Sequence, residues 1–160
     1  MTIAIGDTIP DVELLVIPED RPTPVSSTEI LSKGRVVLFA VPGAFTPGCS
    51  KMHLPGFVNK AADLSAKGVD AIVCLSVNDA FVMDAWGKAQ GVGTQFVMAA
   101  DPQGAFTKAV GMDVDVPALG GLRSKRYAMV IENGVVTQFL PEEDGFNVLA
   151  STAECVLDTL

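Results

Sequence analysis

The chain of 160 residues has few of the residues that form disulfides or bind metal ions. It contains three cysteines, Cys49, Cys74 and Cys155, and a single histidine, His53. Three widely spaced cysteines cannot build a disulfide framework, and neither a C-x-x-C motif nor a Cys/His pair offers metal-ligand spacing. We therefore expect no bound metal, and the cytoplasm, a reducing compartment, fits this cysteine usage best.

Positive charge is also scarce. There are 11 Lys and Arg against 19 Asp and Glu, which gives a formal net charge of -8. A field of this sign repels phosphate backbones and anionic lipid surfaces, so we expect neither nucleic acid nor a membrane as a partner. The N-terminal stretch lacks a basic segment and is interrupted by Pro10. We expect neither a signal peptide nor a membrane span there.

What the chain does contain is enough apolar sequence for a substantial core. It is 49% hydrophobic and 19% charged, a composition typical of a globular protein, and it has no internal repeat. We expect one domain over residues 1–160. Loop-like clusters of polar residues, Pro and Gly occupy residues 18–27 and 111–121.

Two continuous apolar runs, residues 36–41 and 71–77, are typical of strands that are buried on both faces. Between them, apolar residues recur at helical spacing from Leu54 to Ala62, and Lys67-Gly68 is a helix stop. Pro55-Gly56 should interrupt this helix near its start. The pattern predicts a βαβ unit with a right-handed crossover.

The second half of the chain continues the alternation. Asn78-Asp79 can cap a helix that runs to about Lys88, residues 95–100 predict a third strand, and residues 103–110 predict a short helix.

The chain then predicts a β-hairpin and a last helix. Residues 127–131 and 135–139 flank Asn133-Gly134, a strong hairpin turn signal. Apolar residues on one face predict a terminal helix over 149–160. A central mixed β-sheet flanked by helices, with the βαβ unit first and the hairpin last, is an α/β layout of the thioredoxin-like fold.

Cys49 is the candidate nucleophile. It follows a buried strand and lies near the start of a helix, where free backbone N–H groups favour an anion by roughly 0.3–1 kcal/mol. Thr46 can place a hydroxyl beside the sulfur, where it can donate to an anion and accept from a protonated substrate oxygen. Pro42, which has no N–H, can shield the sulfur from water. The alternative is a buried, inert thiol. Its neighbours Gly48 and Ser50 are not apolar, which favours the reactive interpretation.

These residues form the string P-x-x-x-T-x-x-C, and the longer string VPGAFTPGCSKMHLPGF resembles the active-site region of type II peroxiredoxins, also called the peroxiredoxin 5 class. Three further strings carry the same resemblance: CLSVNDAFVMDAW, ADPQGAF and RSKRYAMVIENGVV. It extends from about residue 3 to residue 140. The resemblance implies a thioredoxin-like fold, a homodimer and a peroxidase that needs no cofactor.

The resemblance also implies the site. Cys49 would attack hydrogen peroxide or an alkyl hydroperoxide and become a sulfenic acid, with Thr46, Pro42 and Arg126 beside it. The forked, permanently charged guanidinium of Arg126 can hold a thiolate and a peroxide oxygen together. Without the resemblance Arg126 would be taken as a surface charge. Arg123 is a weaker candidate for a supporting role.

His53 lies four residues after Cys49, so a Cys/His hydrolase pair is one alternative. Such pairs normally come from distant segments and need a third orienting group, which is not evident here. A packed, hydrogen-bonded histidine is therefore the favoured interpretation, and the resemblance implies a supporting role.

The other thiols bear on how a sulfenic acid would be resolved. Cys74 lies within an apolar strand and is expected to be buried and inert, whereas Cys155 is expected to be exposed on the terminal helix. The resemblance implies a resolving cysteine in the C-terminal region of animal members, but Ala150 stands at the matching position. We therefore expect an external thiol, glutathione with glutaredoxin or thioredoxin, to act as reductant.

Two other functions remain open on the same fold. One is a monothiol thiol-disulfide transferase, and the other is a redox-responsive binding module without enzymatic activity. Phe81, Met83 and Trp86 recur at helical spacing and are interpreted as core packing or as part of a dimer surface.

Overall fold

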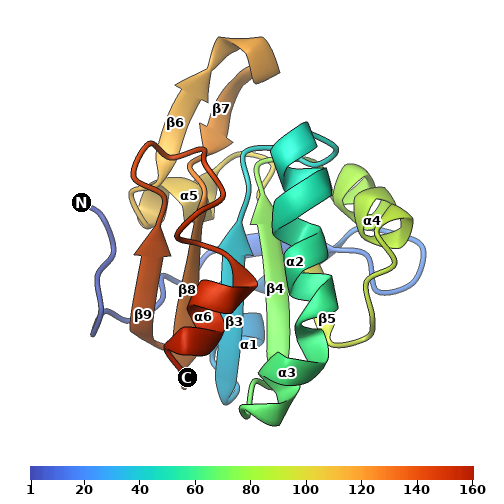
Figure 1. The fold of residues 1–160 in the computed structure, drawn as a ribbon. Helices are drawn as coiled ribbons and strands as arrows, with labels where there is room; N and C mark the ends of the chain where they lie inside the picture. The colour runs from blue at the N-terminus through green and yellow to red at the C-terminus, as the bar shows by residue number, and fades with distance from the viewer.

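The computed structural model describes residues 1–160 and contains a seven-stranded mixed sheet in the order β2-β1-β5-β4-β3-β8-β9 (Figure 1). Strands β3, β4 and β5 pair in parallel, and every other pairing in the sheet is antiparallel. The strands are β1 (Glu13–Val16), β2 (Thr23–Ser26), β3 (Arg35–Ala40), β4 (Ala71–Ser76), β5 (Phe96–Ala100), β8 (Tyr127–Glu132) and β9 (Val135–Pro141).

Helices cover both faces of this sheet (Figure 1). The core on one face contains side chains of α2, α3, α4 and α6, and the core on the other face contains side chains of α1 and α5. None of the helices is long and apolar enough to cross a membrane. Their bounds are α1 (Ser27–Leu31), α2 (Leu54–Asn59), α3 (Ala61–Ala66), α4 (Ala80–Ala89), α5 (Ala105–Ala109) and α6 (Ala153–Asp158).

The continuous apolar run of β3 is explained by its central place in the sheet. Val37 and Phe39 point to one core and Val36 and Leu38 to the other, because successive side chains of a strand alternate between its faces. All four are buried. The predicted layout, a mixed sheet flanked by helices with the βαβ unit before the hairpin, is confirmed.

The predicted capping and turn signals are found as well. Asp79 caps α4 by accepting a hydrogen bond from the backbone N–H of Val82 at 2.9 Å. Asn133 and Gly134 both have positive φ, 51° and 84°, as the tight turn between β8 and β9 requires.

The helix after Cys49 is less regular than predicted. It opens with a π-helical turn, η1 (Cys49–His53), in which the N–H of Leu54 bonds to the carbonyl of Cys49. Pro55 has no N–H to donate, so the irregularity near it is the expected one. A second break at Lys60, which separates α2 from α3, was not predicted.

Both stretches expected to be loops contain strands, so these expectations were wrong. Residues 18–27 include β2, an edge strand that tolerates Pro24 because its N–H side needs no partner. Residues 111–121 include β6 (Asp113–Val116), which pairs with β7 (Gly121–Ser124) through the short 3-10 turn η2 (Pro117–Leu119). This hairpin projects from the main sheet (Figure 1), and the few core contacts of such strands leave a weak apolar pattern.

The terminal helix begins at Ala153 and not at residue 149 as predicted. Thr152 caps it by accepting from the N–H of Cys155 at 3.2 Å. Leu149 is 74% exposed and does not share the buried face of Ala153 and Val156. We call the irregular stretch between β9 and this cap, residues 142–151, the C-terminal clamp.

A test of the core concerns Tyr127. Its hydroxyl is buried without a hydrogen-bond partner, and burial, followed by the charge of Asp101, raises its pKa above the ordinary value. An unpaired buried hydroxyl costs about 1–3 kcal/mol. We expect Tyr127→Phe to increase the free energy of unfolding in urea, by about 1 kcal/mol. A decrease of that size would mean that the hydroxyl has a partner.

Candidate active site

Cys49 lies in the first turn of the helical segment that follows β3, and it is 0% exposed. Its sulfur accepts a hydrogen bond from Nη2 of Arg126 at 3.2 Å. The two residues are 77 positions apart in the chain. Arg126 directly precedes β8, which pairs with β3, and this pairing brings the guanidinium to the start of the helix.

Arg126 is a buried cation, only 4% exposed, and it forms no salt bridge. Its Nε donates to the carbonyl of Phe146 at 2.8 Å, and its Nη1 contacts Nδ1 of His53 at 2.9 Å. Its backbone N–H donates to the carbonyl of Gly145 at 2.7 Å. Because all side-chain partners are neutral groups or the sulfur itself, the positive charge is available to an anion at Cys49.

His53 is buried between Arg126 and the clamp. Its Nε2 lies 2.8 Å from the carbonyl oxygen of Ser151, which can only accept, so Nε2 carries the proton. Nδ1 is then the acceptor for Arg126. Burial, and next the charge of Arg126, lower the pKa of His53 to about 3, so the ring is neutral at neutral pH.

No hydrogen bond joins His53 to Cys49, so the geometry does not support a Cys/His hydrolase pair. The ring instead orients the guanidinium, in line with the packed, hydrogen-bonded histidine that the sequence favoured.

Thr46 and Pro42 lie in the loop between β3 and Cys49. The hydroxyl of Thr46 donates to the carbonyl of Gly43 at 2.6 Å, which leaves its lone pairs free to accept. This differs from the expectation that the hydroxyl would also donate to the thiolate. Pro42 is buried. The loop is fixed by Asn78, whose side-chain oxygen accepts from the N–H of Ala44 at 3.0 Å.

Two backbone features show how tightly this region is built. Phe45 has a left-handed conformation with φ of 64°, which is uncommon for a large side chain, and it is 55% exposed. At Gly48 an added Cβ would lie 3.2 Å from Nη2 of Arg126, so a larger residue would push against the guanidinium.

Arg123, the weaker candidate, does not contact the sulfur. Its guanidinium donates to the carbonyl of Leu119 at 3.1 and 2.6 Å and to that of Val77 at 3.1 Å. It ties the β6-β7 hairpin to the end of β4, and an added Cβ on Gly43 would lie 3.3 Å from it. Its role is to hold the loops around the site.

The remaining residues that the sequence analysis singled out differ in their burial. Cys74 is fully buried in β4, and burial, then the nearby Cys49, raises its pKa. Cys155 is half-buried, with its sulfur 3.3 Å from the carbonyl of Leu149, and is therefore less exposed than predicted. Met83 and Trp86 pack in the core, whereas Phe81 is 61% exposed.

Sequence reasoning missed three features of the site. Trp86 Nε1 donates to the hydroxyl of Ser50 beside Cys49, and Glu142 and Ser151 hold the clamp. No motif or residue spacing in the sequence predicts these contacts. Asn78 could have been suspected, because polar residues directly after the end of a parallel strand commonly line sites.

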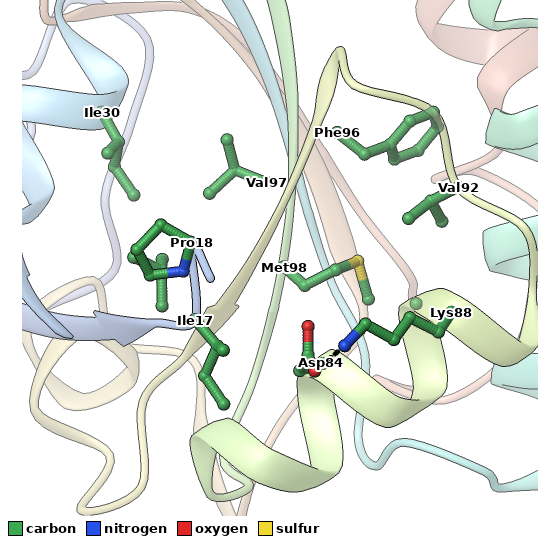
Figure 2. Close-up of a pocket in the computed structure, with 11 residues that line it drawn as sticks. Ile17, Pro18, Ile30, Asp84, Lys88, Val92, Phe96, Val97 and Met98 are labelled. Atoms are coloured by element: carbon green, nitrogen blue, oxygen red, sulfur yellow. Dashed lines mark hydrogen bonds and ion pairs between the residues drawn. The ribbon is translucent and has the colours of Figure 1, made fainter. Parts of the chain in front are cut away.

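A cavity of about 390 Å³ lies elsewhere, at the edge of β5 and beside α4 (Figure 2). Its polar groups Asp84 and Lys88 pair with each other at 2.7 Å. Its lining contains none of the residues around Cys49. No group of three or more His, Cys, Asp or Glu is placed to hold a metal ion.

Comparison with known proteins shows the family to which the chain belongs. The redoxin family matches residues 4–152. The chain is 47% identical to the chloroplastic peroxiredoxin-2E-2 of Oryza sativa subsp. japonica, over 99% of this chain and 73% of that protein. It is 42% identical to peroxiredoxin-2D of Arabidopsis thaliana, over 99% of this chain and 98% of that protein.

Solved structures agree. Reduced Prx3 of Vibrio vulnificus, crystallised in complex with hydrogen peroxide, superposes with a TM-score of 0.94 at 47% identity, covering 99% of each chain. Peroxiredoxin 5 of Alvinella pompejana gives a TM-score of 0.78 at 35% identity, covering 90% of this chain and 92% of that one.

The chain thus belongs to the redoxin family and has the thioredoxin-like fold. Within the family it is a type II peroxiredoxin, and hence a thiol peroxidase.

The lowered pKa of His53 predicts a pH dependence of stability. The unfolded chain protonates this histidine near its ordinary value of 6.5, whereas the folded protein does so only near 3. As pH falls through this window the unfolded state binds the extra proton, so stability is lost at up to about 1.4 kcal/mol per pH unit. In His53→Gln this loss should be absent. Urea unfolding at several pH values measures it, and a difference between the two proteins that stays constant from pH 6.5 to 4 would contradict it.

Proposed function

We propose that Cys49 is the nucleophile of this peroxidase, with Arg126, Thr46 and Pro42 completing the site. One observation carries the proposal: the buried guanidinium of Arg126 has no carboxylate partner and donates to the sulfur of Cys49 at 3.2 Å. A buried cation is stabilised by a nearby anion, and the Cys49 thiolate is the anion within reach.

In the proposed reaction the thiolate attacks the terminal oxygen of the peroxide. An S–O bond forms as the O–O bond breaks, the sulfur is oxidised to a sulfenic acid, and the other oxygen leaves as water or an alcohol after taking up a proton. Three of the five N–H groups of Arg126 are engaged, so two can donate to the peroxide as charge develops.

Thr46 and Pro42 orient and protect this step. Because the proton of the Thr46 hydroxyl is committed to Gly43, its oxygen can accept from the O–H of the peroxide and turn the substrate toward the sulfur. Pro42, which lacks a backbone donor, helps to keep water from the thiolate. Both hydrogen peroxide and alkyl hydroperoxides are proposed substrates.

An external thiol is proposed to return Cys49 to its reduced form. One thiol forms a mixed disulfide with Cys49 and releases water, and a second thiol exchanges with that disulfide. The burial of Cys74 and the carbonyl contact of Cys155 argue against internal resolution. Glutathione with glutaredoxin is the proposed reductant, with thioredoxin as the alternative.

A homodimer in the cytoplasm completes the proposal. The exposed rings of Phe45 and Phe81 lie near Cys49 and on α4, and such apolar groups favour contact with a second chain. The three cysteines are unpaired, as in a reducing compartment.

Replacement of the nucleophile tests the site. We expect Cys49→Ser to abolish peroxide turnover, because a serine hydroxyl supplies almost no anion at neutral pH. Appreciable turnover in this variant would contradict the assignment of Cys49 as the nucleophile.

Replacement of the arginine tests the role of the guanidinium. In stopped-flow measurements of sulfenic acid formation, Arg126→Lys, which keeps the charge but loses the forked pair of donors, should react at least about tenfold more slowly. Wild-type reactivity no faster than that of free cysteine would instead favour the transferase or the binding module.

The reductant is tested with the other two thiols removed. The double variant Cys74→Ser, Cys155→Ser should keep most of its glutathione-supported peroxidase activity and should form a mixed disulfide at Cys49, which intact-mass measurement detects. If this variant stalls as a sulfenic acid, one of the two thiols is a resolving cysteine. The single variants then identify which one.

A further inference from the structure

The C-terminal clamp is held by one buried carboxylate. A single oxygen of Glu142, Oε2, accepts from the backbone N–H groups of Leu149, Ala150 and Ser151 at 3.0, 2.8 and 2.7 Å. It also accepts from the hydroxyl of Ser151 at 2.6 Å. Glu142 forms no salt bridge, so these four hydrogen bonds are what offsets the burial of its charge. Burial acts to raise the pKa of Glu142, but the hydrogen bonds outweigh it and the pKa is lowered.

The fixed end of the clamp is connected to the imidazole ring. Ser151 is fully buried, and its carbonyl oxygen meets Nε2 of His53 at 2.8 Å. Since a carbonyl only accepts, this contact selects the Nε2–H tautomer and leaves the lone pair of Nδ1 toward Arg126. The guanidinium donates to that lone pair at 2.9 Å.

The near end of the clamp holds Arg126 directly. The carbonyl of Arg126 accepts from the N–H of Glu142 at 3.1 Å, and its Nε donates to Phe146. With Nε and Nη1 both engaged, the planar guanidinium has one remaining orientation, in which Nη2 meets the sulfur of Cys49.

We propose that Glu142 is a positioning residue for the peroxidase reaction, acting through Ser151 and His53 on the guanidinium of Arg126. The inference rests on the proposed roles of Cys49 and Arg126. Glu142 does not touch the sulfur. It determines which nitrogen of His53 carries the proton, and hence whether Arg126 finds an acceptor on its Nη1 side.

The variant Glu142→Gln removes the charge with little change of shape. Oε1 of Glu142 has no hydrogen-bond partner in the protein, so the amide group of a glutamine can take its place while the amide oxygen faces the clamp. A neutral oxygen accepts more weakly than a carboxylate, so the clamp loosens without being removed. Glu143→Gln is the matched control, because Glu143 is the exposed neighbour and its side chain forms no hydrogen bond or ion pair.

Two measurements test the proposal. We expect Glu142→Gln to slow sulfenic acid formation at Cys49 by roughly fivefold, with Glu143→Gln at the wild-type rate. His53 is the only histidine in the chain, so its ring-nitrogen NMR signals are unambiguous. They should report the Nε2–H tautomer in the wild type and a mixture of tautomers in Glu142→Gln.

A double-variant cycle tests the route. In the His53→Gln background, Glu142→Gln should cause little further loss of rate, because the two residues act in series. Additive losses, an unchanged rate, or a slower rate with an unchanged His53 spectrum would each overturn the proposal. The spectrum does not depend on peroxide turnover. A tautomer change in Glu142→Gln with activity retained in Cys49→Ser would therefore overturn the proposed nucleophile and not the connection from Glu142 to His53.

Discussion

The site depends on a buried positive charge that no carboxylate neutralises. Transfer of a guanidinium from water into the protein is costly unless its donors are satisfied. Here the acceptors of Arg126 are a carbonyl, a neutral imidazole nitrogen and the sulfur of Cys49. The first two are neutral and satisfy hydrogen bonds without forming an ion pair, so the positive charge remains available to the sulfur. A carboxylate in place of His53 would have stabilised Arg126 better, but the guanidinium would then have stabilised the thiolate of Cys49 less.

This requirement explains why the clamp is irregular. In a helix that began at Leu149, the carbonyl of Ser151 would accept from the N–H of Cys155. In the structure that N–H donates to the side chain of Thr152, the helix cap. The carbonyl of Ser151 is thereby left free for His53. The late start of α6, at which the sequence prediction was wrong, is thus the local condition that lets the imidazole keep its tautomer.

The residues that sequence could predict are those that lie close together in the chain. Pro42, Thr46 and Cys49 fall within one short stretch between β3 and the first turn of the next helix, and the strands beside them are long apolar runs. Arg126 carried no local signal of its own and was found only through the resemblance to a known family. Glu142 and Ser151 could not be found, because their hydrogen bonds lie within an irregular stretch without a recognisable motif. The contact from Ser151 to His53 joins residues that are 98 positions apart in the chain. The short strands β2 and β6 were missed because they bury little, which leaves only a weak alternation of apolar residues.

The burial of Cys49 sets a condition on the proposed reaction. A sulfur with no exposed surface is closed even to a molecule the size of water, so residues around Cys49 must move to admit a peroxide. The proposed reductant, glutathione, is larger than hydrogen peroxide, so the step after oxidation requires the larger movement. In the π-helical turn from Cys49 to His53 the backbone hydrogen bonds depart from the α-helical pattern. Opening this turn therefore breaks fewer regular helical hydrogen bonds than opening the rest of the helix. Oxidation itself favours that opening, because a sulfenic acid is neutral when protonated and no longer balances the charge of Arg126. In the proposed mechanism, the contact between Arg126 and Cys49 that prepares the sulfur for peroxide is thus weakened by the product, and this favours access of the external thiol to the oxidised sulfur.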